Sequence, residues 1–140
     1  MYKRQAPAYA GIPVTHRRAG SSVTFVTGHE EIDKRRPSVD WRALAAATDG
    51  LVIYMGLHNL PLIAEELMAG GLAATTPVAV IQQGTVAGQR CLKATLVDVA
   101  DQCRAEAFKS PSIVVVGEVI DHQVEACRPT PAAVTMPIPF

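Results

Sequence analysis

Two short turns hold the residues of this sequence that are best suited to bind a small molecule. One is Tyr54-Met55-Gly56 and the other is Gln82-Gln83-Gly84-Thr85, and each directly follows a run of apolar residues. Main-chain N–H and C=O groups in such turns can contact a flat heterocycle and its ribose, while Met55 and Val80 supply apolar walls. The glycine in each turn lets a ligand approach the backbone, although a tight turn alone would also explain it. If the two strands are neighbours, the turns form one site.

Other residue types that carry enzyme chemistry show no recognisable spacing. The motifs GxGxxG, GxxxxGK[ST], HExxH and GxSxG are absent. No sequence-near pairing of Ser, His and Asp, or of Cys and His, stands out, although a triad can also be dispersed along a chain. Four scattered histidines are expected to be surface or structural residues. They are His16, His29, His58 and His122.

Cysteine content and composition exclude several classes of protein. Cys91, Cys103 and Cys127 are odd in number and lack CxxC spacing, which favours a reducing compartment over a disulfide framework or a zinc site. We expect no bound metal. Aromatic residues make up 5% of the chain, too few for a base-stacking platform, so nucleic-acid binding is not expected. No apolar run approaches the ~18–20 residues of a membrane span, and residues 1–5 lack the apolar core of a secretory signal. The simplest location is the cytoplasm.

Charge is unevenly distributed along the 140 residues. The formal net charge is zero, yet residues 1–42 carry eight Lys and Arg against four Asp and Glu, a local net charge of +4. Such a basic segment could face an anionic ligand, and a solvated basic surface is the alternative.

The elements that must position the two turns alternate between strand and helix patterns. Residues 51–55 and 77–81 are apolar runs typical of buried strands, and residues 113–119 form a third. After the first run, apolar residues recur at helical spacing, with Asn59 as a possible cap, Pro61 in the first turn and Gly70-Gly71 at the end. A buried strand with its crossover helix, without any ligand, is the simpler interpretation of this stretch taken alone.

The remaining segments complete the predicted fold. Residues 23–27 and 88–94 predict less apolar strands, and the first twenty residues predict a loop. One helix is expected from Ser38 or Asp40 to Asp49-Gly50, and another from a capping box at residues 95–98 until Pro111 stops it. The sequence therefore predicts an α/β fold: a single domain with a central mixed sheet flanked by helices on both faces.

Several of these segments together resemble the tetrapyrrole methylases, and within them the enzymes that methylate uroporphyrinogen III. The matching segments cover about residues 8–120, and the most specific are AYAGIPVTHR at residues 8–17 and SVTFVTGH at residues 22–29. The family has two α/β domains, and this chain resembles the C-terminal one over residues 8–122. Residues 1–7 are an unmatched extension, and residues 123–140 predict a Pro-rich disordered tail. The family's N-terminal glycine-rich segments are not found, which suggests a fragment.

The resemblance implies transfer of a methyl group from S-adenosylmethionine to two pyrrole carbons of uroporphyrinogen III, giving precorrin-2 for sirohaem and cobalamin. Alignment of the reactants, rather than a base, would then be the main contribution of the protein, and the catalytic residues stay unknown. Met55 and Gly84 fall where the family binds S-adenosylmethionine. The full set of candidate cofactor-binding residues is Tyr54, Met55, Gly56, Ala79, Gly84 and Thr85. Arg17, which can pair with a substrate carboxylate, and His29 are the candidate substrate-binding residues.

Three functions stay open on these grounds. The first is the C-terminal half of a uroporphyrinogen III methylating enzyme, a homodimer that is inactive without its N-terminal domain. The second is a non-catalytic α/β module that dimerises or binds nucleosides. The third is a tetrapyrrole methylase with a different substrate.

Overall fold

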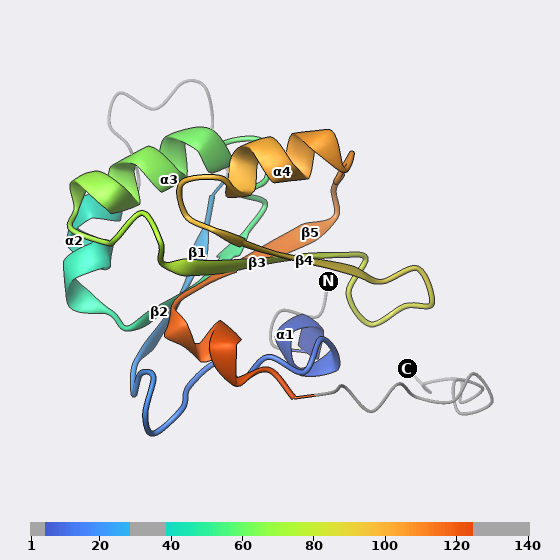
Figure 1. The fold of residues 1–140 in the computed structure, drawn as a ribbon, viewed down its shortest axis with the longest axis horizontal. Coiled ribbons are helices and arrows are strands. Elements are labelled where there is room, and N and C mark those ends of the chain that lie inside the picture. Colours follow the sequence, from blue (N-terminus) through green and yellow to red (C-terminus); the bar gives the residue numbers. More distant parts are fainter. Residues whose placement is uncertain (1–4, 29–38, 125–140) are drawn as a thin grey trace, which may run out of the picture.

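The computed structural model describes residues 5–28 and 39–124. A five-stranded sheet in the order β1-β2-β5-β3-β4 forms its centre, with helices on both faces (Figure 1). The strands are β1 (Val23–Thr27), β2 (Gly50–Tyr54), β3 (Pro77–Gln82), β4 (Arg90–Thr95) and β5 (Ser112–Val116). The helices are α1 (Gln5–Tyr9), α2 (Trp41–Ala47), α3 (Leu60–Ala69), α4 (Val99–Ala105) and the 3-10 helix η1 (Glu118–His122). None of the helices in the described ranges is long and apolar enough to cross a membrane.

The sheet is mixed, as the sequence predicts. β1 is parallel to β2, whereas β5 is antiparallel to both β2 and β3, and β4 is antiparallel to β3. The strands β2 and β3 are therefore not neighbours, because β5 lies between them. Since both run antiparallel to β5, they point the same way and end at the same edge of the sheet, about 9–10 Å apart. We call this edge the carboxyl edge, and the opposite one the amino edge.

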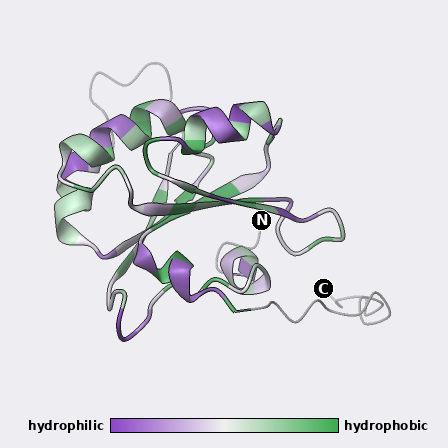
Figure 2. Cartoon of the chain, viewed as in Figure 1, coloured by the Kyte–Doolittle hydropathy of each residue, from purple (hydrophilic) through white to green (hydrophobic). Residues whose placement is uncertain are grey.

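Strand alternation divides the core into two clusters. All five residues of β2 are buried, with Leu51 and Ile53 packing toward α2, α3 and α4, and with Val52 and Tyr54 facing α1 and η1. Figure 2 shows hydrophobic green along the central strands, and bands of both green and purple on α3 and α4. Burial on both faces explains why these strands are continuous apolar runs rather than alternating ones.

Two segments differ from the sequence prediction. Residues 5–9, expected to be loop, form α1, in which Ala6 and Pro7 are buried and Ala6 packs in the same cluster as Val52 and Tyr54 of the sheet. The strand expected over residues 113–119 ends at Val116. Gly117 has a φ of 136°, which is outside the range of an extended strand, so the chain leaves the sheet there. Glycine is required at this position because a Cβ would lie 2.8 Å from the carbonyl oxygen of Asp49.

The helix ends are only partly as predicted. Asp40 caps α2 by accepting the N–H of Ala43 at 2.9 Å. Asn59 precedes α3 but makes no cap; its Nδ2 instead donates to the carbonyl of Gly28 at 2.8 Å, which ties the end of β1 to the start of α3. The expected capping box at residues 95–98 closes a turn, and α4 begins after it. The ends of α2 and α4 come earlier than predicted: Gly50 already belongs to β2, and α4 stops at residue 105.

A carboxylate at the amino edge leads to a prediction on pH. Asp49 Oδ2 accepts the hydroxyl of Ser22 at 2.8 Å and the N–H groups of Ser22 and Ser21 at 3.0 Å each, and these bonds hold the pKa of Asp49 below its ordinary value. A depressed folded-state pKa stabilises the fold above the unfolded-state value of about 4, and this contribution is lost as the pH falls through the folded-state pKa. Asp49→Asn should therefore lower the melting temperature at neutral pH, and the difference from the parent should shrink on acidification.

Thermal unfolding followed by circular dichroism at a series of pH values measures this difference. Asp101→Asn, on an exposed part of α4, is the matched control. A gap between parent and Asp49→Asn that stays constant down to acid pH would contradict the role of the carboxylate.

Candidate functional site

The two turns singled out in the sequence lie at the carboxyl edge. In the sheet register, Ile113 at the start of β5 pairs with Tyr54 on one side and with Ile81 on the other, and Ser112 pairs with Gln82. The turn after β2 and the turn after β3 therefore flank the start of β5. The structure brings Tyr54, Met55 and Gly56 together with Gly84 and Thr85 along one edge, across one intervening strand.

Strained backbone is concentrated in these turns. Met55, Gln83 and Thr85 have φ values of 51°, 50° and 76°, three of the four non-glycine residues with positive φ in the described ranges. Residues other than glycine rarely adopt this backbone conformation, and those that do cluster at binding sites. Met55 is 52% exposed, in contrast to the fully buried strand that precedes it. The N–H groups of Met55 and Gly84 have no hydrogen-bond partner within residues 5–28 and 39–124.

The glycines of the turns are explained by packing rather than by a left-handed backbone. A Cβ on Gly84 would lie 2.5 Å from Ala6 Cβ and 3.3 Å from Ala6 Cα, so α1 packs directly against this turn. A Cβ on Gly56 would lie 2.7 Å from Cγ2 of Ile53. Neither glycine has positive φ. Glycine is therefore required at both positions because a side chain would collide with the protein's own atoms.

Ser112 lies at the centre of the same edge. Its side chain is 5% exposed, and its Oγ has no hydrogen-bond partner among the described residues. By strand alternation Ser112 shares the sheet face of Val114, the face covered by α3 and α4. A buried hydroxyl without a partner is unfavourable unless a ligand or water completes its hydrogen bonds. Ser112 therefore fits a polar ligand bound at this edge.

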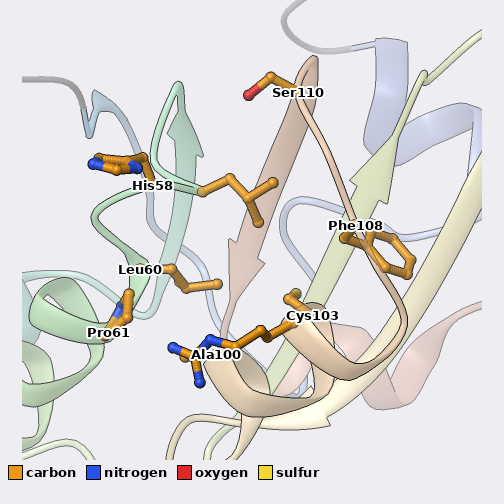
Figure 3. Close-up of a pocket in the computed structure, with 9 residues that line it drawn as sticks. His58, Leu60, Pro61, Ala100, Cys103, Phe108 and Ser110 are labelled. Carbon is orange, nitrogen blue, oxygen red and sulfur yellow. The ribbon is translucent and has the colours of Figure 1, made fainter.

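A cavity of about 460 Å³ opens beside the carboxyl edge on this helical face (Figure 3). His58 and Pro61 lie on one side of it, at the start of α3, and Cys103 and Phe108 lie on the other. The remaining lining residues are Leu57, Leu60, Ala100, Arg104 and Ser110. Burial raises the pKa of Cys103 to about 11, with a further increase from Glu106, so its thiol is protonated at neutral pH and does not act as a nucleophile. Within the described ranges no three His, Cys, Asp or Glu residues are placed to hold a metal ion.

Other candidate residues lie elsewhere. Ala79 is fully buried inside β3 and does not reach the carboxyl edge. Arg17 lies in the short hairpin closed by His16 and Gly20, next to Asp49 at the amino edge. The five residues of β2 separate it from Met55, roughly 16 Å along the strand. The structure thus does not bring Arg17 together with the two turns, and His29 lies outside the described residues.

The comparison with known protein families matches residues 4–100 to the Tetrapyrrole (Corrin/Porphyrin) Methylases. The chain belongs to this family. The resemblance of residues 8–17 and 22–29 to tetrapyrrole methylases is therefore confirmed. The carboxyl edge, with its two strained turns, is part of a tetrapyrrole methylase domain.

Individual members of the family are similar over most of this chain. It is 48% identical over 117 residues to the uroporphyrinogen-III C-methyltransferase of Synechocystis sp., covering 84% of this chain and 44% of that protein. It is 50% identical over 114 residues to the S-adenosyl-L-methionine-dependent uroporphyrinogen III methyltransferase of Methanosarcina barkeri, covering 81% and 45%. The chain spans about half the length of these curated relatives.

A solved tetrapyrrole methylase shares the fold described above. It is the uroporphyrin-III C-methyltransferase of Thermus thermophilus, solved in complex with S-adenosylhomocysteine. The two chains superpose with a TM-score of 0.68 at 28% identity, over 84% of this chain and 50% of that one.

One residue of this edge escaped prediction from the sequence. Ser112 is the only polar residue of the last buried strand, SIVVV, and it stands where that strand begins. A single polar residue at the end of an apolar run is the signal that could have identified it. Ser112 is notable because it is buried without a hydrogen-bond partner in residues 5–28 and 39–124, and this burial follows from the packing of β5 between β2 and β3.

Proposed function

We propose that this chain forms one wall of the active site of an S-adenosylmethionine-dependent uroporphyrinogen-III C-methyltransferase. The observation that carries the proposal is the carboxyl edge. There the strained turns at Met55 and Gln83–Thr85 flank the hydroxyl of Ser112, which is unpaired in the part of the chain that the structure describes. The relatives named above support this substrate and this methyl donor.

The residues at the edge fit a nucleoside. The main-chain N–H groups of Met55 and Gly84, which have no partner among the described residues, can donate to a flat heterocycle or its ribose. The exposed Met55 side chain can cover an apolar ring face. Ser112 Oγ adds a donor and acceptor between them. We assign Met55, Gly84 and Ser112 to this contact, with Tyr54, Gly56 and Thr85 shaping the turns.

S-adenosylmethionine, when bound, would supply an electrophilic methyl group. The pyrrole carbon that accepts it is already nucleophilic, so the chain would not need a catalytic base. The role of these turns would be to hold one reactant in line with the other. Such alignment lowers the activation barrier by roughly 7–11 kcal/mol. The rigid sheet edge suits that task because its turns are fixed by packing, as the contact of Gly84 with α1 illustrates.

The complete enzyme would need a second wall. We propose that an N-terminal tetrapyrrole methylase domain forms that wall and packs against the domain at residues 8–122. The complete enzyme would be a homodimer in the cytoplasm. The eight carboxylates of uroporphyrinogen III make Arg17 and His29 candidate partners for the substrate. Because Arg17 lies at the amino edge, it would meet a peripheral carboxylate rather than the reacting carbon.

The test is a titration of the 140-residue chain with S-adenosylhomocysteine, followed by NMR of backbone amides. With only one wall present, we expect millimolar binding at best, and amide shifts concentrated in residues 54–56, 83–85 and 112. Adenosine alone is the control, because the main-chain contacts proposed here recognise the nucleoside. Shifts confined to the amino edge would contradict this assignment. Micromolar affinity by calorimetry would instead contradict the argument that the chain supplies only one wall.

A further inference from the structure

We propose that Gln89 is a positioning residue that holds the turn Gln83-Gly84-Thr85 in its binding conformation, an inference that rests on the proposed function of this turn. Gln89 Oε1 accepts the N–H of Thr85 at 2.8 Å, and Gln89 Nε2 donates to the carbonyl of Tyr9 at 3.3 Å. One amide side chain thereby joins the turn after β3 to the end of α1.

The turn needs such support because its backbone is strained. Gln83 and Thr85 both have left-handed φ values, and a β-branched threonine is unusual in that region. Such a conformation persists only where the surrounding structure holds it. Gln83 is held by its N–H, which donates to the carbonyl of Pro111 at 3.0 Å. Thr85 is held by Gln89.

The position of Gln89 lets it act on both segments at once. It closes the loop that begins at the turn, since its own N–H donates to the carbonyl of Val86 at 3.0 Å, and it directly precedes β4. The orientation of its amide is fixed by its partners, because only Oε1 can accept from Thr85 and only Nε2 can donate to Tyr9. Since Gly84 packs on Ala6 of α1, the same helix meets the turn twice.

A consequence for ligand binding follows. The side chain of Gln89 bonds to protein atoms. Gly84, one residue before Thr85, carries the N–H that we assign to the nucleoside and that has no partner among the described residues. If Thr85 relaxes to an extended conformation, this N–H moves away from its place opposite Met55. Gln89 thus determines where the ligand-facing group lies without touching the ligand.

The experiment uses Gln89→Leu in this chain joined to the N-terminal domain of a tetrapyrrole methylase. Loss of the bond to Thr85 should raise both the Kd for S-adenosylhomocysteine and the KM for S-adenosylmethionine about tenfold. The value of kcat should change much less than these two binding constants, because Gln89 contacts no reacting atom. Gln89→Glu keeps an acceptor for Thr85 and should retain most of the affinity.

Gln123→Leu is the matched control. Gln123 Nε2 donates to the carbonyl of Ala10, so this side chain also holds the segment that follows α1. Among the described residues it forms no hydrogen bond with residues 83–85. We expect no change in affinity for this variant. In the 140-residue chain without ligand, amide exchange of Thr85 should be faster in Gln89→Leu than in the parent or in Gln123→Leu.

The outcomes separate this inference from the proposed function. Unchanged affinity and unchanged Thr85 exchange in Gln89→Leu would overturn the positioning role, as would equal losses in Gln89→Leu and Gln123→Leu. If the joined parent fails to bind S-adenosylhomocysteine, the proposed function fails. Faster Thr85 exchange in Gln89→Leu would even then support the role of Gln89 in holding the turn.

Discussion

Joined to the N-terminal domain of a tetrapyrrole methylase, this chain should convert uroporphyrinogen III to precorrin-2, whereas the chain by itself should show no measurable turnover. The candidate site at Met55, Gly84 and Ser112 lies along one edge of the sheet, and a single edge cannot enclose two reactants. Without a second wall the reactants are not held in line and water is not excluded, which forfeits roughly 7–11 kcal/mol of barrier lowering. Such a loss reduces turnover below detection.

Turnover is followed by absorbance under anaerobic conditions, with the joined protein, the 140-residue chain and the N-terminal domain alone compared at equal concentration. Conversion by the 140-residue chain would show that its edge is a complete site. A folded joined protein that binds S-adenosylhomocysteine but does not methylate would instead favour the non-catalytic nucleoside-binding module.

Gly84→Val should destabilise the fold as well as weaken ligand binding. In the sequence, Gly84 marks a place where a ligand could approach the backbone, but a Cβ added there would lie 2.5 Å from Ala6 Cβ in α1. Overpacking of this kind costs about 1–3 kcal/mol, since α1 must move away from the turn. Urea unfolding measures the loss, and titration with S-adenosylhomocysteine in the joined protein measures the accompanying change in affinity.

A double-mutant cycle isolates the contact between the turn and α1. Ala6→Gly removes the nearest atom, so Gly84→Ala should cost less free energy of unfolding in that background than in the parent, with a coupling of about 1 kcal/mol. Gly88→Ala is the control in the same loop, because its Cβ would meet only the end of the Gln83 side chain, which can move. Additive effects of Gly84→Ala and Ala6→Gly would show that α1 does not pack on the turn.

The local sequence determined most elements of this fold. The apolar run after Gly50 and the helical spacing of Leu60, Ile63 and Leu67 predict β2 and α3, because burial of one strand or one helix face leaves a pattern within a few residues. The turns at Met55 and Gly84 could also be located from the sequence, because each follows an apolar run. The family could be identified because its motifs are contiguous segments.

Only the tertiary structure decided how these elements meet. Nothing in the sequence shows that β5 enters between β2 and β3, because strand order depends on pairing between segments far apart in the chain. That insertion keeps the two turns on one edge and buries Ser112 between them. Likewise the five residues of α1 carry no helical signal, since so short a helix is stable only through its packing on the sheet. The charge of Arg17 was visible in the sequence, but its position at the amino edge follows from the hairpin packed beside Asp49, a contact between residues about thirty positions apart in the chain.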